Sequence, residues 1–216
     1  MDIKFIIGKL PYLLDGSIMT IKLTVITLFF GSILGVILAL LKITKNIFTS
    51  GIASFYIWVF RGTPLILQLF FFYYALPMMG ITMSPFTAAV IGLSLNCGAY
   101  MAEIIRGGII SIDKGQFEAA KALGFNYFQT MKKIVLPQTF RVIIPPVGNE
   151  FITMLKDTSL VSTIAMVELM RSAVQISSAT FKYTEMLFTA AILYLIMTTV
   201  FTSIFSAVEK KLSRYS

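Results

Sequence analysis

The chain has 216 residues, of which 57% are apolar and only 13% are charged. Because a soluble globular domain is about 45–50% apolar and about 25% charged, this composition excludes an ordinary soluble domain and predicts an integral membrane protein. The net charge is +8, but the basic residues lie mostly between apolar runs, which favours a role in membrane topology over nucleic-acid binding.

Histidine is absent and Cys97 is the only cysteine. This usage excludes a disulfide framework, histidine-based metal sites and Cys/His catalysis, so we expect no metal site. We interpret Cys97 as a small buried apolar residue.

We predict a single all-α transmembrane domain over residues 1–216. Five apolar stretches are long enough to cross a bilayer, for which about 20 residues are needed. They lie at residues 18–41, 52–76, 86–110, 139–165 and 186–208. Residues 1–15 are expected to form a separate short helix at the membrane interface, because their apolar side chains fall on one side.

Proline positions predict breaks in two of the stretches. Arg61-Gly62-Thr63-Pro64 predicts a kink in the second stretch at Pro64, with Arg61 paired to an acidic side chain. In the fourth stretch, Pro145-Pro146 predicts an interruption at the entry to the helix. Asp157-Thr158-Ser159 could then begin a new helical segment whose freed backbone groups line a cavity.

The basic residues predict the orientation in the membrane, because Lys and Arg favour cytoplasmic loops. They are concentrated after the first stretch, after the third stretch and in the tail that contains Lys210, Lys211 and Arg214. We therefore expect the N-terminus outside, and the C-terminus and the loop at 111–138 in the cytoplasm.

The loop at 111–138 carries the signals of two short helices. Asp113 can cap a first helix that stops at Gly124, a residue preferred just after a helix end. Asn126 can cap a second helix, which Pro137 is expected to end. Two short helices bent about Gly124 would form a compact knob that a soluble partner could bind. An amphipathic helix lying on the membrane would show the same pattern.

The residues of this loop resemble the signature loop of the membrane subunits of ATP-binding-cassette (ABC) importers, Glu-Ala-Ala-x3-Gly-x9-Ile-x-Leu-Pro. The matching positions are Glu118, Ala119, Ala120, Gly124, Ile134, Leu136 and Pro137. Three further segments are similar to the polar amino acid permeases of that class: Phe60–Pro64, Asn96–Gly108 and Leu155–Leu160. The resemblance covers roughly residues 10–210. It implies a type I ABC importer fold, with five membrane-spanning helices and a cytoplasmic coupling helix between the third and fourth.

The resemblance also implies the partners. Glu118, Ala119, Ala120 and Gly124 would couple the chain to a cytoplasmic ATPase. The complex would contain a second copy of the chain or a related permease, two ATPase subunits and an extracytoplasmic substrate-binding protein, in the inner membrane of a prokaryotic cell. The chain itself has no Gly-x4-Gly-Lys-Ser/Thr loop, so we expect ATP and Mg on the partner and neither an enzyme nor a cofactor here.

Polar residues inside the predicted spans are candidates for a substrate site, because ionisable groups in a membrane are costly and functional by default. They are Asn96, Tyr100, Glu103, Glu150 and Asp157. Spacings of four, three and seven residues place the first three on one helical face and the last two on another. We predict that all five surround a site in mid-membrane.

Each acid also has a purely structural interpretation, which the residues leave open. Glu103 could hold helices together by pairing with Arg106 or Arg61, and Asp157 could cap a helix or pair with Lys156. Glu150 could be an anion at the inner membrane surface. We assign Arg61, Pro64 and Arg106 structural or gating roles.

Three acids against one or two buried bases leave an excess of negative charge, which suits arginine, lysine or protonated histidine. Glu150 is the better indicator of a cationic substrate, since Glu103 and Asp157 lie in segments shared with permeases that also move glutamine. We therefore predict uptake of cationic amino acids by ATP-driven alternating access. The alternatives are glutamine or another polar amino acid, or an ion-coupled carrier, for which we find no inverted repeat.

Overall fold

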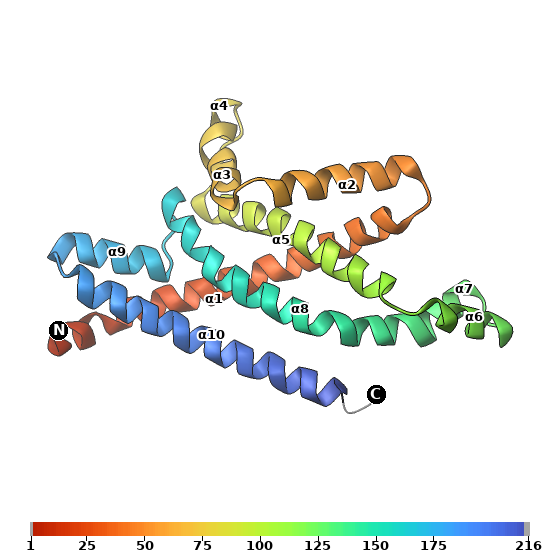
Figure 1. Cartoon of the computed structure of the whole chain (residues 1–216). Helices are drawn as coiled ribbons and strands as arrows, with labels where there is room; N and C mark the ends of the chain where they lie inside the picture. Colours follow the sequence, from red (N-terminus) through yellow and green to blue (C-terminus); the bar gives the residue numbers. More distant parts are fainter. Residues whose placement is uncertain (1, 214–216) are drawn as a thin grey trace.

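The computed structural model describes residues 2–213, and within them the chain forms helices joined by short turns (Figure 1). Arg214 of the predicted basic tail lies outside this part. The α-helices are α1 (Ile3–Ile43), α2 (Ile47–Gly62), α3 (Leu65–Phe70), α4 (Leu76–Met78), α5 (Pro85–Ile110), α6 (Lys114–Ala122), α7 (Tyr127–Thr130), α8 (Leu136–Asp157), α9 (Leu169–Thr180) and α10 (Tyr183–Ser213). Between them lie two π-helical turns, η1 (Phe71–Ala75) and η2 (Met131–Val135), and one 3₁₀ helix, η3 (Thr158–Ile164).

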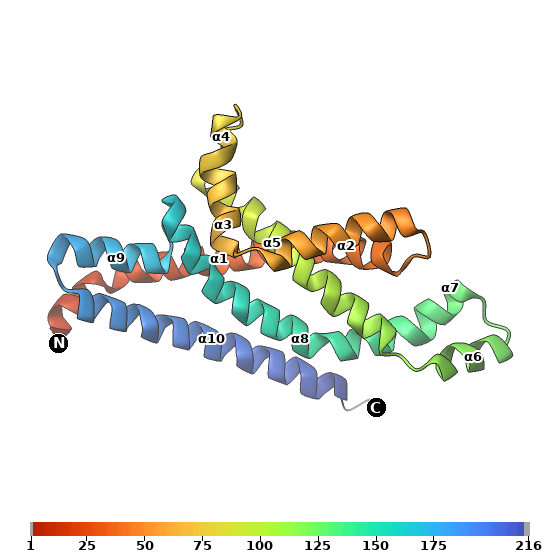
Figure 2. The same ribbon diagram turned by 45° about the horizontal axis from the view of Figure 1, so that its top comes forward.

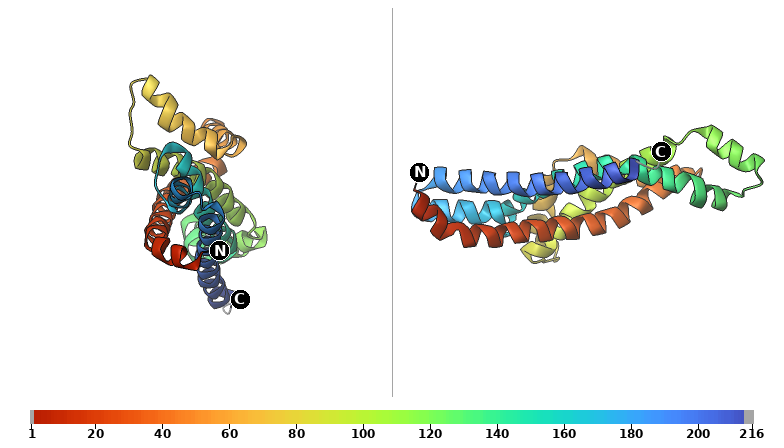
Figure 3. Two further views of the ribbon diagram at one scale, coloured as in Figure 1. Left: turned by 90° about the vertical axis from the view of Figure 1, so that its left-hand side faces the viewer. Right: turned by 90° about the horizontal axis from the view of Figure 1, so that it is seen from below.

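Three helices, α1, α5 and α10, are each long and apolar enough to cross a membrane. Two bent pairs bring the number of candidate spans to five: α2 with α3–α4, bent by 102°, and α7–η3 with α9, bent by 47°. The all-α class with five candidate spans is as predicted, but two of the five spans are broken. Seen end-on, the long helices form a narrow bundle from which α3 and α4 project (Figure 3).

α1 is a continuous helix of 41 residues, so the predicted separate interfacial helix over residues 1–15 is wrong. Pro11 lies inside α1 and removes one backbone donor without breaking the helix. Packing explains the continuity, because Leu13 and Gly16 are buried against α9 and the start of α10. The N-terminus is also held there, since Asp2 caps α1 and forms an ion pair with Lys182 in the turn before α10.

The centre of the molecule is the close packing of α1 on α5, which uses small residues as membrane helices commonly do. A Cβ added at Gly31 would lie 2.6 Å from Sγ of Cys97, and one at Gly35 would lie 2.5 Å from Cβ of Met101. Cys97 itself is fully buried, as expected. The two helix backbones can therefore approach only because these positions lack side chains.

We expect Gly35→Ala to lower the melting temperature of the purified protein in detergent, because overpacking a tight contact costs about 1–3 kcal/mol. Gly51→Ala is the matched control, since a Cβ at Gly51 in α2 meets nothing within 4 Å. There the gain in helix propensity, about 1 kcal/mol, should keep the melting temperature unchanged or raise it. Equal effects of the two substitutions would contradict the close packing of α1 on α5.

The fourth span differs from its prediction in the position of its break. Pro137 does not end a helix, since the π-helical turn η2 leads directly into α8 and Pro137 is the second residue of α8. Pro145 and Pro146 lie inside α8 and do not interrupt it. The bend comes after η3, where Ala165 adopts a left-handed backbone with φ of 63°.

Different segments of the chain lie at the two ends of the bundle. α6 and α7 extend beyond one end, and the last turns of α10 point the same way (Figures 1 and 2). The N-terminus, α9 and the turn into α10 lie at the opposite end. The loop between the third and fourth spans is therefore free to meet a partner outside the bundle.

Candidate functional site

The predicted knob is present, and local hydrogen bonds define its shape. The Asp113 carboxylate accepts from the backbone N–H of Gly115 at the start of α6. At its end Gly124 has φ of +80°, and the N–H groups of Gly124 and Phe125 donate to the carbonyls of Lys121 and Ala120, both at 3.0 Å. These paired bonds are a Schellman motif, which explains the need for glycine at this position.

The second helix of the knob begins with the expected cap. The Asn126 side chain accepts from the N–H of Gln129, and the Gln129 side chain accepts from the N–H of Asn126, both at 2.9 Å. This reciprocal capping box fixes the angle at which the chain leaves Gly124. The knob is therefore a folded unit at the end of the bundle (Figure 2).

The surface of the knob differs in part from the predicted set of coupling residues. Glu118 and Ala119 are exposed, but Ala120 is fully buried, so it shapes the knob and is not part of its outer surface. Three large apolar side chains that the sequence analysis did not assign are 71–74% exposed: Leu123, Tyr127 and Phe128. Exposed apolar side chains grouped on a projection are typical of a protein-binding surface.

Asn96 is buried and forms hydrogen bonds at the break in span two. Its amide donates to the carbonyl of Phe60 and to Oε1 of Gln68, both at 3.0 Å. Gln68 donates in turn to the Phe60 carbonyl and to the carbonyl and hydroxyl of Thr63. The backbone groups freed around Pro64 are thereby satisfied by side chains, as a break at membrane depth requires. The break lies where the sequence predicts the kink.

Glu103 pairs with two bases. Nε and Nη2 of Arg106 donate to Oε2 at 3.2 and 2.9 Å, and Nζ of Lys42 binds Oε1. The pair with Arg106 was one of the predicted alternatives, whereas Lys42 was not considered because span one was predicted to end at residue 41. Arg61 does not pair with Glu103; its guanidinium lies over the ring of Tyr100, 5.1 Å from the centroid.

These side chains border an open pocket of about 420 Å³ between α2, α5 and the end of α1. Its polar lining comes from Lys42, Arg61, Tyr100 and Glu103. Of the five predicted substrate residues, Tyr100 and Glu103 line this pocket, together with Arg61. Asn96 is not among the residues that line this pocket.

Glu150 and Asp157 lie on α8, seven residues apart, and both are partly buried. Their spacing of about two helical turns places both carboxylates on one face of α8. Within residues 2–213 we find neither a hydrogen bond nor an ion pair that engages either carboxylate.

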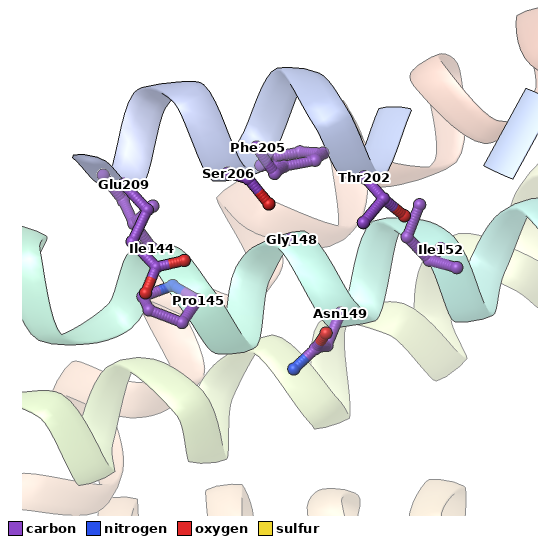
Figure 4. A pocket seen from close by; sticks show the side chains of 9 residues that line it. All are labelled: Ile144, Pro145, Gly148, Asn149, Ile152, Thr202, Phe205, Ser206 and Glu209. Atoms are coloured by element: carbon purple, nitrogen blue, oxygen red, sulfur yellow. The ribbon is translucent and has the colours of Figure 1, made fainter. Parts of the chain in front are cut away.

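A second pocket, of about 150 Å³, lies between α8 and α10 and contains none of the predicted substrate residues (Figure 4). Gly148 faces Phe205 here, and a Cβ on Gly148 would lie 2.9 Å from Cγ of that ring. Asn149 and Glu209 supply polar groups at its rim. Its small volume makes it a packing groove between helices.

Comparison with known proteins agrees with this architecture. Residues 31–214 match the family described as "Binding-protein-dependent transport system inner membrane component". The chain belongs to this family.

Relatives in the family are amino acid permeases. The chain is 45% identical to the arginine transport system permease protein ArtQ of Bacillus subtilis, over 98% of this chain and 97% of that one. It is 42% identical to the putative glutamine transport system permease protein GlnP of Rickettsia bellii (94% of each chain). It is 41% identical to the L-cystine transport system permease protein TcyB of Bacillus subtilis (95% and 88%).

A solved structure described as an amino acid ABC transporter with histidines superposes with a TM-score of 0.93 at 39% identity, over 98% of this chain and 99% of that one. The methionine ABC transporter MetNI superposes with a TM-score of 0.80 at 19% identity, over 94% and 97%, which supports the fold alone. The chain is therefore the permease subunit of an amino acid ABC importer, with the type I importer fold. As in its relatives, ATP hydrolysis belongs to a separate subunit.

Proposed function

We propose that this permease takes up cationic amino acids, with arginine, lysine and histidine as candidates, by ATP-driven alternating access. The observation that carries the proposal is the pair Glu150 and Asp157 on α8, whose carboxylates have no counter-ion in contact within residues 2–213. Two carboxylates on one helical face without a counter-ion favour a cation beside them. A guanidinium can form forked hydrogen bonds with such groups, which would fix its orientation.

The remaining predicted residues have supporting roles in this proposal. The Arg61 guanidinium lies over the Tyr100 ring in the pocket between α2 and α5, and these two side chains would bind the substrate's carboxylate and carbon chain. Glu103 and Arg106 form, with Lys42, a charged cluster that connects α1 and α5, and we assign this cluster and the Pro64 break to gating. Asn96 stabilises the Pro64 break through its hydrogen bond to Gln68.

We further propose a homodimer of this chain with two cytoplasmic ATPase subunits and an extracytoplasmic binding protein in a prokaryotic inner membrane. The knob would dock on the ATPase, which places it and the C-terminus in the cytoplasm and the N-terminus outside. The opposite positions of the knob and the N-terminus in the bundle agree with that orientation (Figure 1). The exposed apolar side of α10 would face lipid or the second copy.

The test is uptake of labelled arginine into lipid vesicles that contain the whole complex with its binding protein. We expect uptake to require ATP and to be competed by lysine or histidine more strongly than by glutamine. Stronger competition by glutamine would favour the second candidate, a glutamine permease, which the relatives named for glutamine support. Uptake driven by an ion gradient without ATP would refute the mechanism.

A further inference from the structure

Glu168 is a fully buried acid that no predicted site includes. It lies at the bend between η3 and α9, and its carboxylate accepts four hydrogen bonds. Two come from the backbone N–H groups of Met170 and Arg171, at 2.8 and 2.7 Å. The other two come from the hydroxyls of Tyr194 on α10 and Thr20 on α1, at 2.9 and 3.4 Å. One carboxylate therefore connects the start of α9 to two other membrane helices.

Four donors and no base in contact make the site specific for a carboxylate. The Arg171 guanidinium does not pair with Glu168; it donates to the carbonyl of Ser162 in η3 at 2.8 Å. A glutamine at this position would turn its NH₂ group towards one of the two backbone N–H donors, whichever way its amide pointed. A buried donor would then be left without an acceptor, which is unfavourable.

The segment held in this way leads back to the proposed substrate site. η3 begins directly after Asp157 and is followed by Ala165, whose left-handed backbone is strained for a residue other than glycine. The far end of η3 is bound to α9 by Arg171 and to span two by the Tyr74 hydroxyl, which donates to the carbonyl of Thr163 at 3.0 Å. Asp157 and Glu168 therefore lie at the two ends of the segment that contains η3 and the bend at Ala165.

We propose that Glu168 is a positioning residue for transport: by tying α9 to α1 and α10 it fixes η3, and through η3 the place of Asp157. This inference rests on the proposed function in that Asp157 belongs to the substrate site. Glu168 does not contact the substrate. The fold does not depend on it alone, because Leu169 and Ala173 also pack α9 against Leu13 and Met186.

The first test measures whether η3 is held in place, and it does not depend on a transport assay. Val161 is fully buried in η3, and the one native thiol, Cys97, is also fully buried. The thiol introduced by Val161→Cys therefore becomes reactive when η3 opens locally. We would measure its labelling by a maleimide in the purified permease–ATPase complex. We expect Glu168→Gln to speed labelling about tenfold, the effect of losing one hydrogen bond to a buried charged group. Tyr194→Phe, which removes one hydroxyl, should speed it about threefold.

The control variants make the same two substitutions, Glu to Gln and Tyr to Phe, at exposed positions away from Glu168. Glu209→Gln alters an exposed acid on α10, and Tyr183→Phe removes an exposed hydroxyl that is 3.3 Å from Ser178. Neither should change the labelling rate. If Glu168→Gln does not assemble, Tyr194→Phe carries the same test. Unchanged labelling in Tyr194→Phe and in any assembled Glu168→Gln would overturn the proposal.

The second test separates positioning from mere stability. In vesicles we expect Tyr194→Phe and Glu168→Gln to raise the KM for arginine uptake severalfold, while ATP hydrolysis per assembled complex stays close to that of the wild type. A purely structural role would lower both activities in proportion to the assembled protein, and an unchanged KM would overturn the proposal. If the wild type took up no arginine with ATP, the proposed function would fail, and labelling alone would decide whether Glu168 fixes η3.

Discussion

Glu150→Gln should weaken arginine binding by about tenfold to a hundredfold, because a hydrogen bond to a charged group contributes about 1.5–3 kcal/mol. The substitution keeps the size of the side chain and removes its charge, so the loss reports electrostatic recognition. We would measure equilibrium binding of labelled arginine to the purified permease–ATPase complex.

Glu209→Gln is the matched control for this substitution, since Glu209 is exposed near the end of α10 and lines only the second pocket. It should bind arginine like the wild type. Glu150→Gln with wild-type affinity would refute the role of Glu150 in a cation site, although the chain would remain a permease of this family.

Glu118→Lys should abolish ATP-driven uptake while leaving the permease folded. Glu118 is exposed on α6, in the same knob as the exposed apolar side chains Leu123, Tyr127 and Phe128. Reversing a charge in a docking surface places like charges together or leaves a partner's base unpaired, which costs several kcal/mol. We expect at least a tenfold loss of uptake and of ATPase association, with an unchanged melting temperature of the isolated permease.

Glu209→Lys makes the same change of charge outside the knob and should retain uptake. Co-purification of the ATPase with each variant separates loss of docking from loss of transport. If Glu118→Lys retained the ATPase and full uptake, the exposed side of α6 would not be the coupling surface.

Features encoded by local signals were predictable. The left-handed Gly124, the capping box at Asn126 and the kink at Pro64 each depend on a few neighbouring residues whose backbone preferences are strong. The number of spans was also predictable, because the length of each apolar stretch is read directly from consecutive residues. Cys97 was predicted to be buried from its residue type, and it packs against Gly31.

Features that depend on contacts between distant helices were not predictable. Glu103 meets Lys42 across 61 positions of the chain, and Asn96 meets Gln68 across 28, so neither pair has a local pattern. Prolines misled the interpretation of α8, because packing and a π-helical turn accommodate them. The actual bend at Ala165 has no glycine or proline to mark it, and so α9 and the role of Glu168 were missed.

The measurement that tests the central claim most directly compares arginine with citrulline, which has nearly the same shape but a neutral end group. Equilibrium binding of each to the purified permease–ATPase complex, without the external binding protein, isolates the site in the membrane. We predict that arginine binds at least about tenfold more tightly, because only its cation gains from the charges of Glu150 and Asp157. Equal binding of the two, or tighter binding of citrulline, would contradict a site that recognises a cation.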